Sequence, residues 1–187
     1  RPGLRVPGSW DGFELALRAV LGQQISVAGA TTLTRRLVEQ YGEDRLIKRD
    51  NLDRAFPKPE VIANASLEKI GLPKSRAATL RSMAQALIDG EISFQAGQNM
   101  DTFVQKFTSL PGIGPWTAQY VAMRALRQPD AFPAGDLILQ QVMGGDKRLS
   151  EKETEARSQA WRPWRAYSVL HLWHLSGDIA KEKKDVV

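Results

Sequence analysis

The strongest candidate for chemistry in this chain is an aspartate at an expected helix start. Asp136 follows the sequence FPAG (132–135) and precedes an apolar run over residues 137–143. An aspartate there caps a helix, because its carboxylate accepts hydrogen bonds from free backbone N–H groups. The same donors keep the carboxylate ionised, which suits it to stabilising positive charge that develops on a substrate. The pattern supports both a structural cap and a catalytic carboxylate.

A second motif is the glycine-containing segment LPGIG, which comprises Leu110, Pro111, Gly112, Ile113 and Gly114. Two glycines one residue apart let the backbone turn sharply and bring its N–H groups close to an anion. The helix expected to follow adds unpaired N–H donors and the positive end of its dipole. A nucleic-acid phosphate is a natural ligand for such a turn. The alternative, a corner between two helices with glycines for packing, stays open on spacing alone.

Large aromatic residues are concentrated in the second half of the chain. Trp116, Trp161, Trp164 and Trp173 all lie there, and Tyr120 follows Trp116 by one helical turn. Large aromatic side chains are mostly buried, so core packing is one interpretation of this concentration. A pocket that stacks on nucleic-acid bases is the other.

The elements that must position these residues are all expected to be helices. Apolar residues recur at helical spacing, capping patterns precede them, and neither strand-length alternation nor a hairpin signal occurs. The charge-dense run 43–54 predicts a solvated loop or a short helix. The spacing predicts helices over residues 11–21, 25–41, 59–63, 66–70, 73–89, 101–110, 115–128, 137–143 and 163–176, with a further helix opened by the capping box of Ser150 and Glu153.

Composition bounds the function. The 187 residues include 26 Lys plus Arg and 21 Asp plus Glu, a formal charge of +5 that suits a polyanion partner. The lack of cysteine excludes a thiol nucleophile, a thiolate zinc site and an iron–sulfur cluster. No apolar run approaches the roughly 20 residues that span a bilayer, and no signal-peptide core is present, so we expect neither a membrane protein nor a secreted one. Because the chain begins with Arg1, we expect a fragment whose upstream domain is missing.

Taken together, the motifs resemble a known family. The segments LGQQIS (21–26) and LPGIGPWTA (110–118), with an aspartate twenty residues after Trp116, resemble the helix-hairpin-helix DNA glycosylase superfamily. The opening RPGLR (1–5) and the segment WRPWRAY (161–167) are similar to its 3-methyladenine DNA glycosylase II branch. The resemblance covers nearly the whole chain. It implies a two-lobed all-α fold with a central lobe over 22–128, a hairpin at 108–118, and a second lobe from 1–21 plus 130–187.

The resemblance also assigns roles to the candidate residues. Asp136 matches the family's catalytic aspartate at the cleft between the lobes. Trp116 and Trp173 match aromatic residues of the pocket that receives a flipped base, and Tyr120 is their expected neighbour.

Other family roles concern DNA and a cation. Gln24 lies where relatives insert a wedge into the DNA stack in place of the flipped nucleotide, although some of them use leucine there. The phosphate anchor matches the hairpin residues Leu110, Gly112, Ile113 and Gly114. Backbone carbonyls of Thr108, Leu110 and Ile113 match a structural monovalent or divalent cation site.

The activity implied is hydrolytic release of alkylated purines, of the 3-methyladenine and 7-methylguanine type, from double-stranded DNA. Relatives that also nick the strand carry a lysine where this chain has Trp116, and no lysine lies between Lys106 and Lys147. We therefore expect an intact strand with an abasic site and no catalytic cofactor. The expected protein is a monomer in the bacterial cytoplasm or the eukaryotic nucleus. A non-catalytic helix-hairpin-helix DNA-binding module is the main alternative, and a bifunctional glycosylase with lyase activity is a third.

Overall fold

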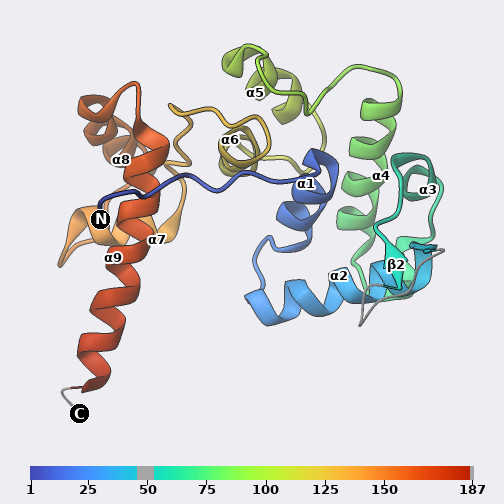
Figure 1. Cartoon of the computed structure of the whole chain (residues 1–187), viewed down its shortest axis with the longest axis horizontal. Coiled ribbons are helices and arrows are strands. Elements are labelled where there is room, and N and C mark those ends of the chain that lie inside the picture. Colours follow the sequence, from blue (N-terminus) through green and yellow to red (C-terminus); the bar gives the residue numbers. More distant parts are fainter. Residues whose placement is uncertain (46–52, 186–187) are drawn as a thin grey trace.

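The computed structural model describes residues 1–45 and 53–185, and these residues form a predominantly helical protein, which confirms the all-α prediction (Figure 1). Two short 3-10 helices, η1 and η2, lie between consecutive α-helices. The helices are α1 (Gly12–Leu21), α2 (Val27–Tyr41), α3 (Pro59–Ala63), η1 (Leu67–Ile70), α4 (Lys74–Ile88), α5 (Met100–Thr108), α6 (Pro115–Arg124), α7 (Leu137–Gly144), α8 (Glu151–Ser158), η2 (Gln159–Trp161) and α9 (Arg165–Asp185).

The charge-dense run differs from its prediction. Its described ends form two strands of two residues each, β1 (Glu43–Asp44) and β2 (Arg54–Ala55), which pair antiparallel with Glu43 opposite Ala55. Residues 46–52 of the run lie outside the described residues. The predicted loop or short helix is therefore wrong at these ends, where Arg54 also forms an ion pair with Asp44 across the strands.

Several helix boundaries also differ, and α6 ends at Arg124 and not at residue 128. Helix α5 spans Met100–Thr108 and not the predicted 101–110, because Asn99 caps it by accepting a hydrogen bond from the N–H of Thr102. Helix α9 runs through Gly177 to Asp185 and does not end near Ser176. A glycine ends a helix when it turns left-handed, and Gly177 lacks that conformation, so the helix continues.

The helices form two groups, with α5 and α6 lying between the right-hand helices α1–α4 and the left-hand helices α7–α9 in Figure 1. Helix α1 packs against α6, α4 and α2, while α7 packs against α9 and α8. The expected division had placed residues 12–21 in the second lobe, together with residues 130–187. These residues pack instead with the group of helices α1–α4. The reason is the apolar face of α1, whose side chains Ala16, Leu17, Val20 and Leu21 are completely buried.

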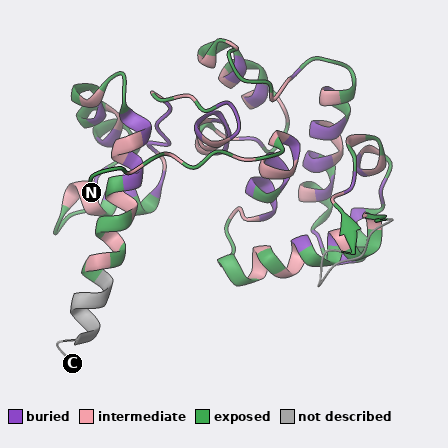
Figure 2. Ribbon diagram, in the orientation of Figure 1, coloured by how far each residue is buried: buried purple, intermediate pink, exposed green. Residues whose placement is uncertain are grey.

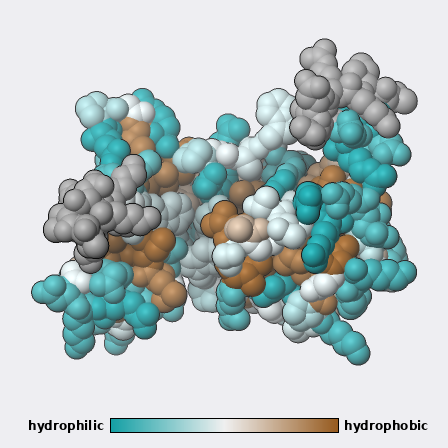
Figure 3. Space-filling view, turned by 90° about the horizontal axis from the view of Figure 1, so that it is seen from below, coloured by the Kyte–Doolittle hydropathy of each residue, from teal (hydrophilic) through white to brown (hydrophobic). Residues whose placement is uncertain are grey.

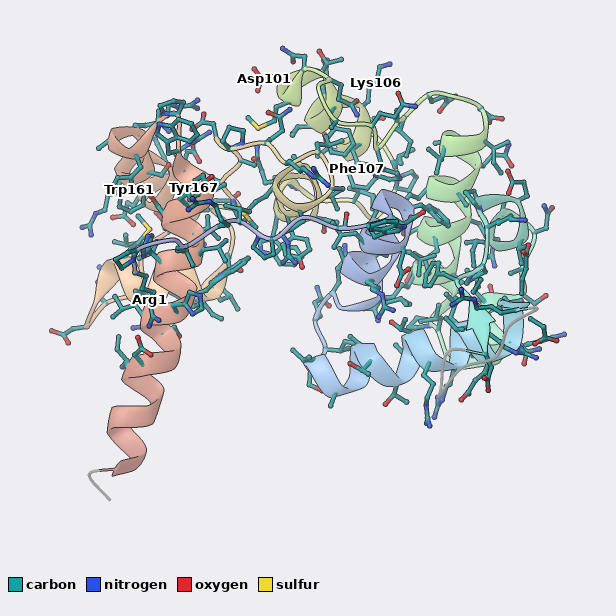
Figure 4. The ribbon with its side chains drawn as sticks, in the orientation of Figure 1. Arg1, Asp101, Lys106, Phe107, Trp161 and Tyr167 are labelled. Carbon is teal, nitrogen blue, oxygen red and sulfur yellow. The ribbon has the colours of Figure 1, made fainter. Side chains whose placement is uncertain are left out.

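Residues 1–9 follow an extended path that links the two groups. Arg1 lies beside α9, where its guanidinium pairs with the carboxylate of Asp178 (Figure 4). At the other end, the N–H of Ser9 donates to the carbonyl of Arg124 in α6. Buried residues extend through both groups and meet around α6, as the purple segments of Figure 2 show.

Candidate active site

Asp136 is the N-cap of α7, as its sequence context predicts. Its Oδ1 accepts hydrogen bonds from the backbone N–H groups of Ile138 at 2.9 Å and Leu139 at 3.1 Å. The residue is 9% exposed. Both capping bonds go to Oδ1, which leaves Oδ2 available for another donor.

Two indoles also donate to this carboxylate. Trp116 Nε1 lies 3.1 Å from Oδ2, and Trp173 Nε1 lies 3.4 Å from Oδ1. Trp116 stacks on Tyr120 with ring centroids 5.4 Å apart and planes 8° apart, and Tyr120 lies 6.3 Å from Trp173. The structure thus brings together all four residues expected at the pocket, from α6, α7 and α9. Each indole can present a π face while its N–H holds the carboxylate.

The segment before Asp136 is fixed from several directions. Gln119 of α6 accepts a hydrogen bond from the N–H of Phe132 at 3.0 Å, and Gln140 of α7 donates to the carbonyl of Ala134 at 3.1 Å. Because Gln119 is on the same helix as Trp116, the carboxylate and the indole share one support. Such fixed positions allow a charge to act on a substrate without reorganisation.

The hairpin joins α5 to α6. Gly112 adopts the left-handed conformation with φ 81°, and the N–H of the buried Ile113 donates to the carbonyl of Leu110 at 3.1 Å. Gly114 caps α6 without a side-chain hydrogen bond, so the first N–H groups of that helix have no side-chain acceptor. In proteins generally, an uncapped helix start of this kind can bind an anion such as a phosphate.

A cavity of about 590 Å³ connects these features. Its walls include Gln24, Gly112, Gly114, Trp116 and Asp136, so the expected wedge, anchor, aromatic and carboxylate residues share one opening. The remaining expected site residues, Tyr120, Trp173, Thr108, Leu110 and Ile113, are not part of its wall. Viewed from below, hydrophobic surface lies on both sides of the hollow between the left-hand part of the molecule and its centre (Figure 3).

The cavity wall also contains residues that the sequence did not single out. Gln23 and Thr117 line it, as do Leu137 and Ile138, which are 63% and 46% exposed at the start of α7. The sequence signal that could have indicated Leu137 and Ile138 is their position directly after the candidate carboxylate Asp136. Gln23 carries no signal of its own beyond its place next to Gln24.

The other two tryptophans of the second half lie elsewhere. Trp161 packs edge-on against Phe132 with ring centroids 6.2 Å apart, and it lies in the left-hand group with Tyr167 (Figure 4). Trp164 is 58% exposed and meets Tyr167 edge-on. Neither lines the cavity, so core packing accounts for Trp161, and base stacking in this pocket accounts for neither.

Two further features are absent from the described part of the chain. Between residues 1–45 and 53–185, no group of three or more histidine, cysteine or acidic side chains is placed to hold a metal ion. Within the same ranges, no helix combines the length and apolar character that crossing a membrane requires.

In this predominantly helical fold, a glycine hairpin, a buried aspartate and one of the two tryptophans that bind the aspartate line a single cavity. Residues 17–166 match the HhH-GPD superfamily of base excision DNA repair proteins, and the chain belongs to that family. The sequence is 35% identical over 182 residues to DNA-3-methyladenine glycosylase 2 of Escherichia coli, covering 95% of this chain and 62% of that protein. It is 38% identical over 176 residues to a probable bifunctional transcriptional activator/DNA repair enzyme AlkA of Mycobacterium tuberculosis, covering 92% of this chain and 35% of that protein.

Solved structures show the same fold. The 3-methyladenine DNA glycosylase Mag1 of Schizosaccharomyces pombe, in complex with abasic DNA, matches with a TM-score of 0.76 and 23% identity, covering 95% of this chain and 85% of that one. MBOgg1 in complex with a low-affinity DNA ligand matches with a TM-score of 0.83 and 16% identity, covering 95% and 63%. The chain thus spans between about a third and two thirds of the two bacterial relatives, and most of Mag1.

Proposed function

We propose that this chain is a DNA glycosylase that hydrolyses the N-glycosidic bond of alkylated purines in double-stranded DNA. The observation that carries the proposal is the carboxylate of Asp136, held by two backbone N–H groups and two indoles at the wall of a cavity. The cavity also opens onto the hairpin that supplies phosphate-binding N–H groups. Its family is one of base excision repair proteins, which supports the same reaction.

The chemistry needs a fixed negative charge. When the bond between sugar C1′ and the base nitrogen breaks, its electron pair leaves with the base and positive charge develops on the sugar. Asp136 stabilises that charge, and water then adds to C1′ and loses a proton. An alkylated purine already carries a positive charge, so it leaves as a neutral base without strong acid catalysis. Its cationic ring also stacks favourably on the indole of Trp116 or Trp173.

The strand is proposed to stay intact after the base is released. Strand cleavage by a lyase requires an amine that attacks the sugar and forms a Schiff base. Trp116 occupies the position after the hairpin, and among the described residues of the cavity wall there is no lysine. The product is then an abasic site.

A structural cation is proposed at the hairpin. Carbonyl oxygens are the donors that hard cations prefer, and Thr108, Leu110 and Ile113 offer them at the end of α5 and in the turn. The Leu110 carbonyl accepts one hydrogen bond, from Ile113, which leaves a second lone pair for a cation. Such an ion would add positive charge next to the proposed phosphate position.

The second candidate function is a DNA-binding module without catalysis. The uncapped start of α6 at the hairpin favours it, because phosphate binding alone accounts for that geometry. It leaves unexplained the clustering of Trp116 and Trp173 on one carboxylate.

The deciding experiment measures base release from methylated duplex DNA by the wild-type chain and by Asp136→Asn. Asparagine still caps α7 through its Oδ1, so the variant keeps the cap and loses the charge together with the oxygen that Trp116 Nε1 donates to. We expect base release to fall at least a hundredfold, in the range seen when an electrostatic group is removed from an active site. DNA affinity should stay equal or rise, because a negative charge near phosphates is gone.

The matched control is Asp146→Asn, which removes the same charge at an exposed position shortly after α7. It should release bases like the wild type. Product strands are analysed before and after alkali, and breaks that appear only after alkali indicate a glycosylase without lyase activity. Duplex binding without base release by the wild-type chain would favour the binding module.

A further inference from the structure

The turn that carries Gln24 has an unusual backbone. Gln24 follows α1 and adopts φ 57°, in the left-handed region that residues other than glycine rarely occupy. Its side chain is exposed at the edge of the cavity. A strained, exposed glutamine persists only where its surroundings hold the backbone in place.

Two hydrogen-bonded groups of the preceding residue supply that hold. The Gln23 carbonyl accepts a hydrogen bond from the Arg76 guanidinium of α4 at 2.8 Å. The Gln23 side-chain amide donates to the Gly112 carbonyl at 3.2 Å and to the Thr117 hydroxyl at 3.0 Å. The turn is therefore tied to α4 through its backbone and to the hairpin and α6 through its side chain.

Helix α4 contacts the hairpin as well. Thr79 lies one turn after Arg76 and is buried, and its side chain packs so closely against Gly112 that a Cβ at that glycine would overlap the hydroxyl. Residues three positions apart lie on one face of a helix. One face of α4 thus touches both the turn of Gln24 and the turn of the hairpin.

We infer that Arg76, Gln23 and Thr79 are positioning residues that hold Gln24 at a fixed distance from the hairpin. This inference rests on the proposed function, in which Gln24 fills the gap left by a flipped nucleotide while the hairpin binds a phosphate. Because Gln24 and the hairpin are both held by the same face of α4, they contact the DNA at a fixed separation from each other. Binding energy at the phosphate is then available to drive Gln24 into the base stack.

The test uses a duplex with a stable abasic analogue and 2-aminopurine as the neighbouring base, whose fluorescence rises when it is unstacked. Insertion of Gln24 should raise the fluorescence at saturating wild-type protein. Arg76→Met should lower the equilibrium constant for insertion about tenfold, the effect of losing a hydrogen bond from a charged donor. Arg76→Lys keeps a charged donor and should recover part of the loss.

The control is Arg81→Met on the same helix, which removes the same charge but contacts the Ala65 carbonyl and Glu68. It should behave like the wild type. The same pair of changes is then made in a Gln24→Gly background, where glycine accepts the left-handed backbone and no wedge remains. There Arg76→Met should have no further effect on the fluorescence.

Three results would overturn the inference: equal effects of Arg76→Met and Arg81→Met, an equal loss in both backgrounds, or no change with Gln24→Gly. Melting temperatures identify a variant that loses its fold, and Arg76→Lys then carries the comparison. Base release is measured in parallel. A wild-type chain that unstacks the probe but releases no base refutes the glycosylase proposal and leaves this inference standing.

Discussion

The two oxygens of Asp136 are held by different parts of the molecule. Oδ1 is bound by the backbone at the start of α7 and by Trp173 of α9, while Oδ2 is bound by Trp116 of α6. The cap fixes the carboxylate to its own helix, and the Trp116 bond fixes its rotation. A structural cap and a catalytic carboxylate are therefore two consequences of one arrangement.

Trp116→Phe tests the importance of that second bond. Phenylalanine keeps an aromatic face for stacking and removes the only hydrogen bond that the described residues make to Oδ2. We expect base release under single-turnover conditions to fall about tenfold at unchanged DNA affinity. Trp173→Phe should cost less, because its bond is longer and Oδ1 keeps two backbone donors.

Trp164→Phe is the matched control, since Trp164 is exposed and its ring packs against Tyr167 and not against the Asp136 carboxylate. It should leave both rate and affinity unchanged. Equal rates for Trp116→Phe and the wild type would show that stacking alone explains the tryptophan. A loss of DNA affinity in place of rate would assign Trp116 to binding.

At the scale of elements, the sequence predicts helices well where local signals decide them. The cap at Asp136, the capping box at Ser150 and the end of α2 at Tyr41 all match their patterns. Strands β1 and β2 escaped prediction because a ladder of two residues leaves no alternation to detect. The predicted end of α9 at residue 176 was wrong, because a glycine such as Gly177 permits a left-handed turn without requiring one.

The capping box of α8 gives a prediction at this scale. Ser150 accepts from the N–H of Glu153, and Glu153 accepts from the Ser150 N–H and hydroxyl, which lowers the pKa of the Glu153 carboxyl below 4.5. A carboxyl with a lowered pKa in the folded state stabilises above its unfolded value, and the effect is lost as the pH falls through the folded value. Ser150→Ala should lower the melting temperature at pH 7 by about 2–4 °C.

Glu153→Ala and Glu151→Ala separate the cap from the charge. Both remove a carboxylate from the first turn of α8, but only Glu153 makes the capping bonds. Melting curves from pH 7 down to pH 3 should show a larger cost for Glu153→Ala at pH 7 and a difference that shrinks below about pH 4.5. A difference that is constant over this range would contradict a role of the ionised carboxylate in the cap.

At the scale of the whole molecule, the candidate site lies where the two groups of helices meet. Asp136 comes from the left-hand group, and Trp116, Gly112 and Gln24 come from the central and right-hand helices. Motifs predicted Asp136, Gly112 and Trp116 individually, and the family resemblance added Gln24. The supports Arg76 and Gln119 had no sequence signal, because hydrogen bonds between an arginine or glutamine and a distant backbone leave no local pattern.

The left-hand group depends on a buried arginine. The guanidinium of Arg165, only 3% exposed, donates to Asp130 from Nε at 2.8 Å and to Glu155 from Nη1 at 2.8 Å. Asp130 begins the segment that leads to Asp136, Glu155 is in α8, and Arg165 starts α9. One side chain therefore connects the loop that supplies the carboxylate to two helices.

Arg165→Met should lower the free energy of unfolding by about 2–3 kcal/mol, because Asp130 loses its buried partner and keeps only the half-exposed Arg162. Adding Asp130→Asn should recover part of this loss, because it removes a carboxylate that then pairs only with Arg162. Urea unfolding measures both values, and the control is Arg157→Met, an exposed arginine of α8 that contacts the Met143 carbonyl of α7 but no carboxylate of the described residues. Hydrogen exchange should show the loss of protection mainly in α7, α8 and α9 and much less in α2–α4. Equal loss across all helices would mean that the two groups unfold as one unit. The ion pairs of Arg165 would then stabilise the whole fold and not the left-hand group in particular.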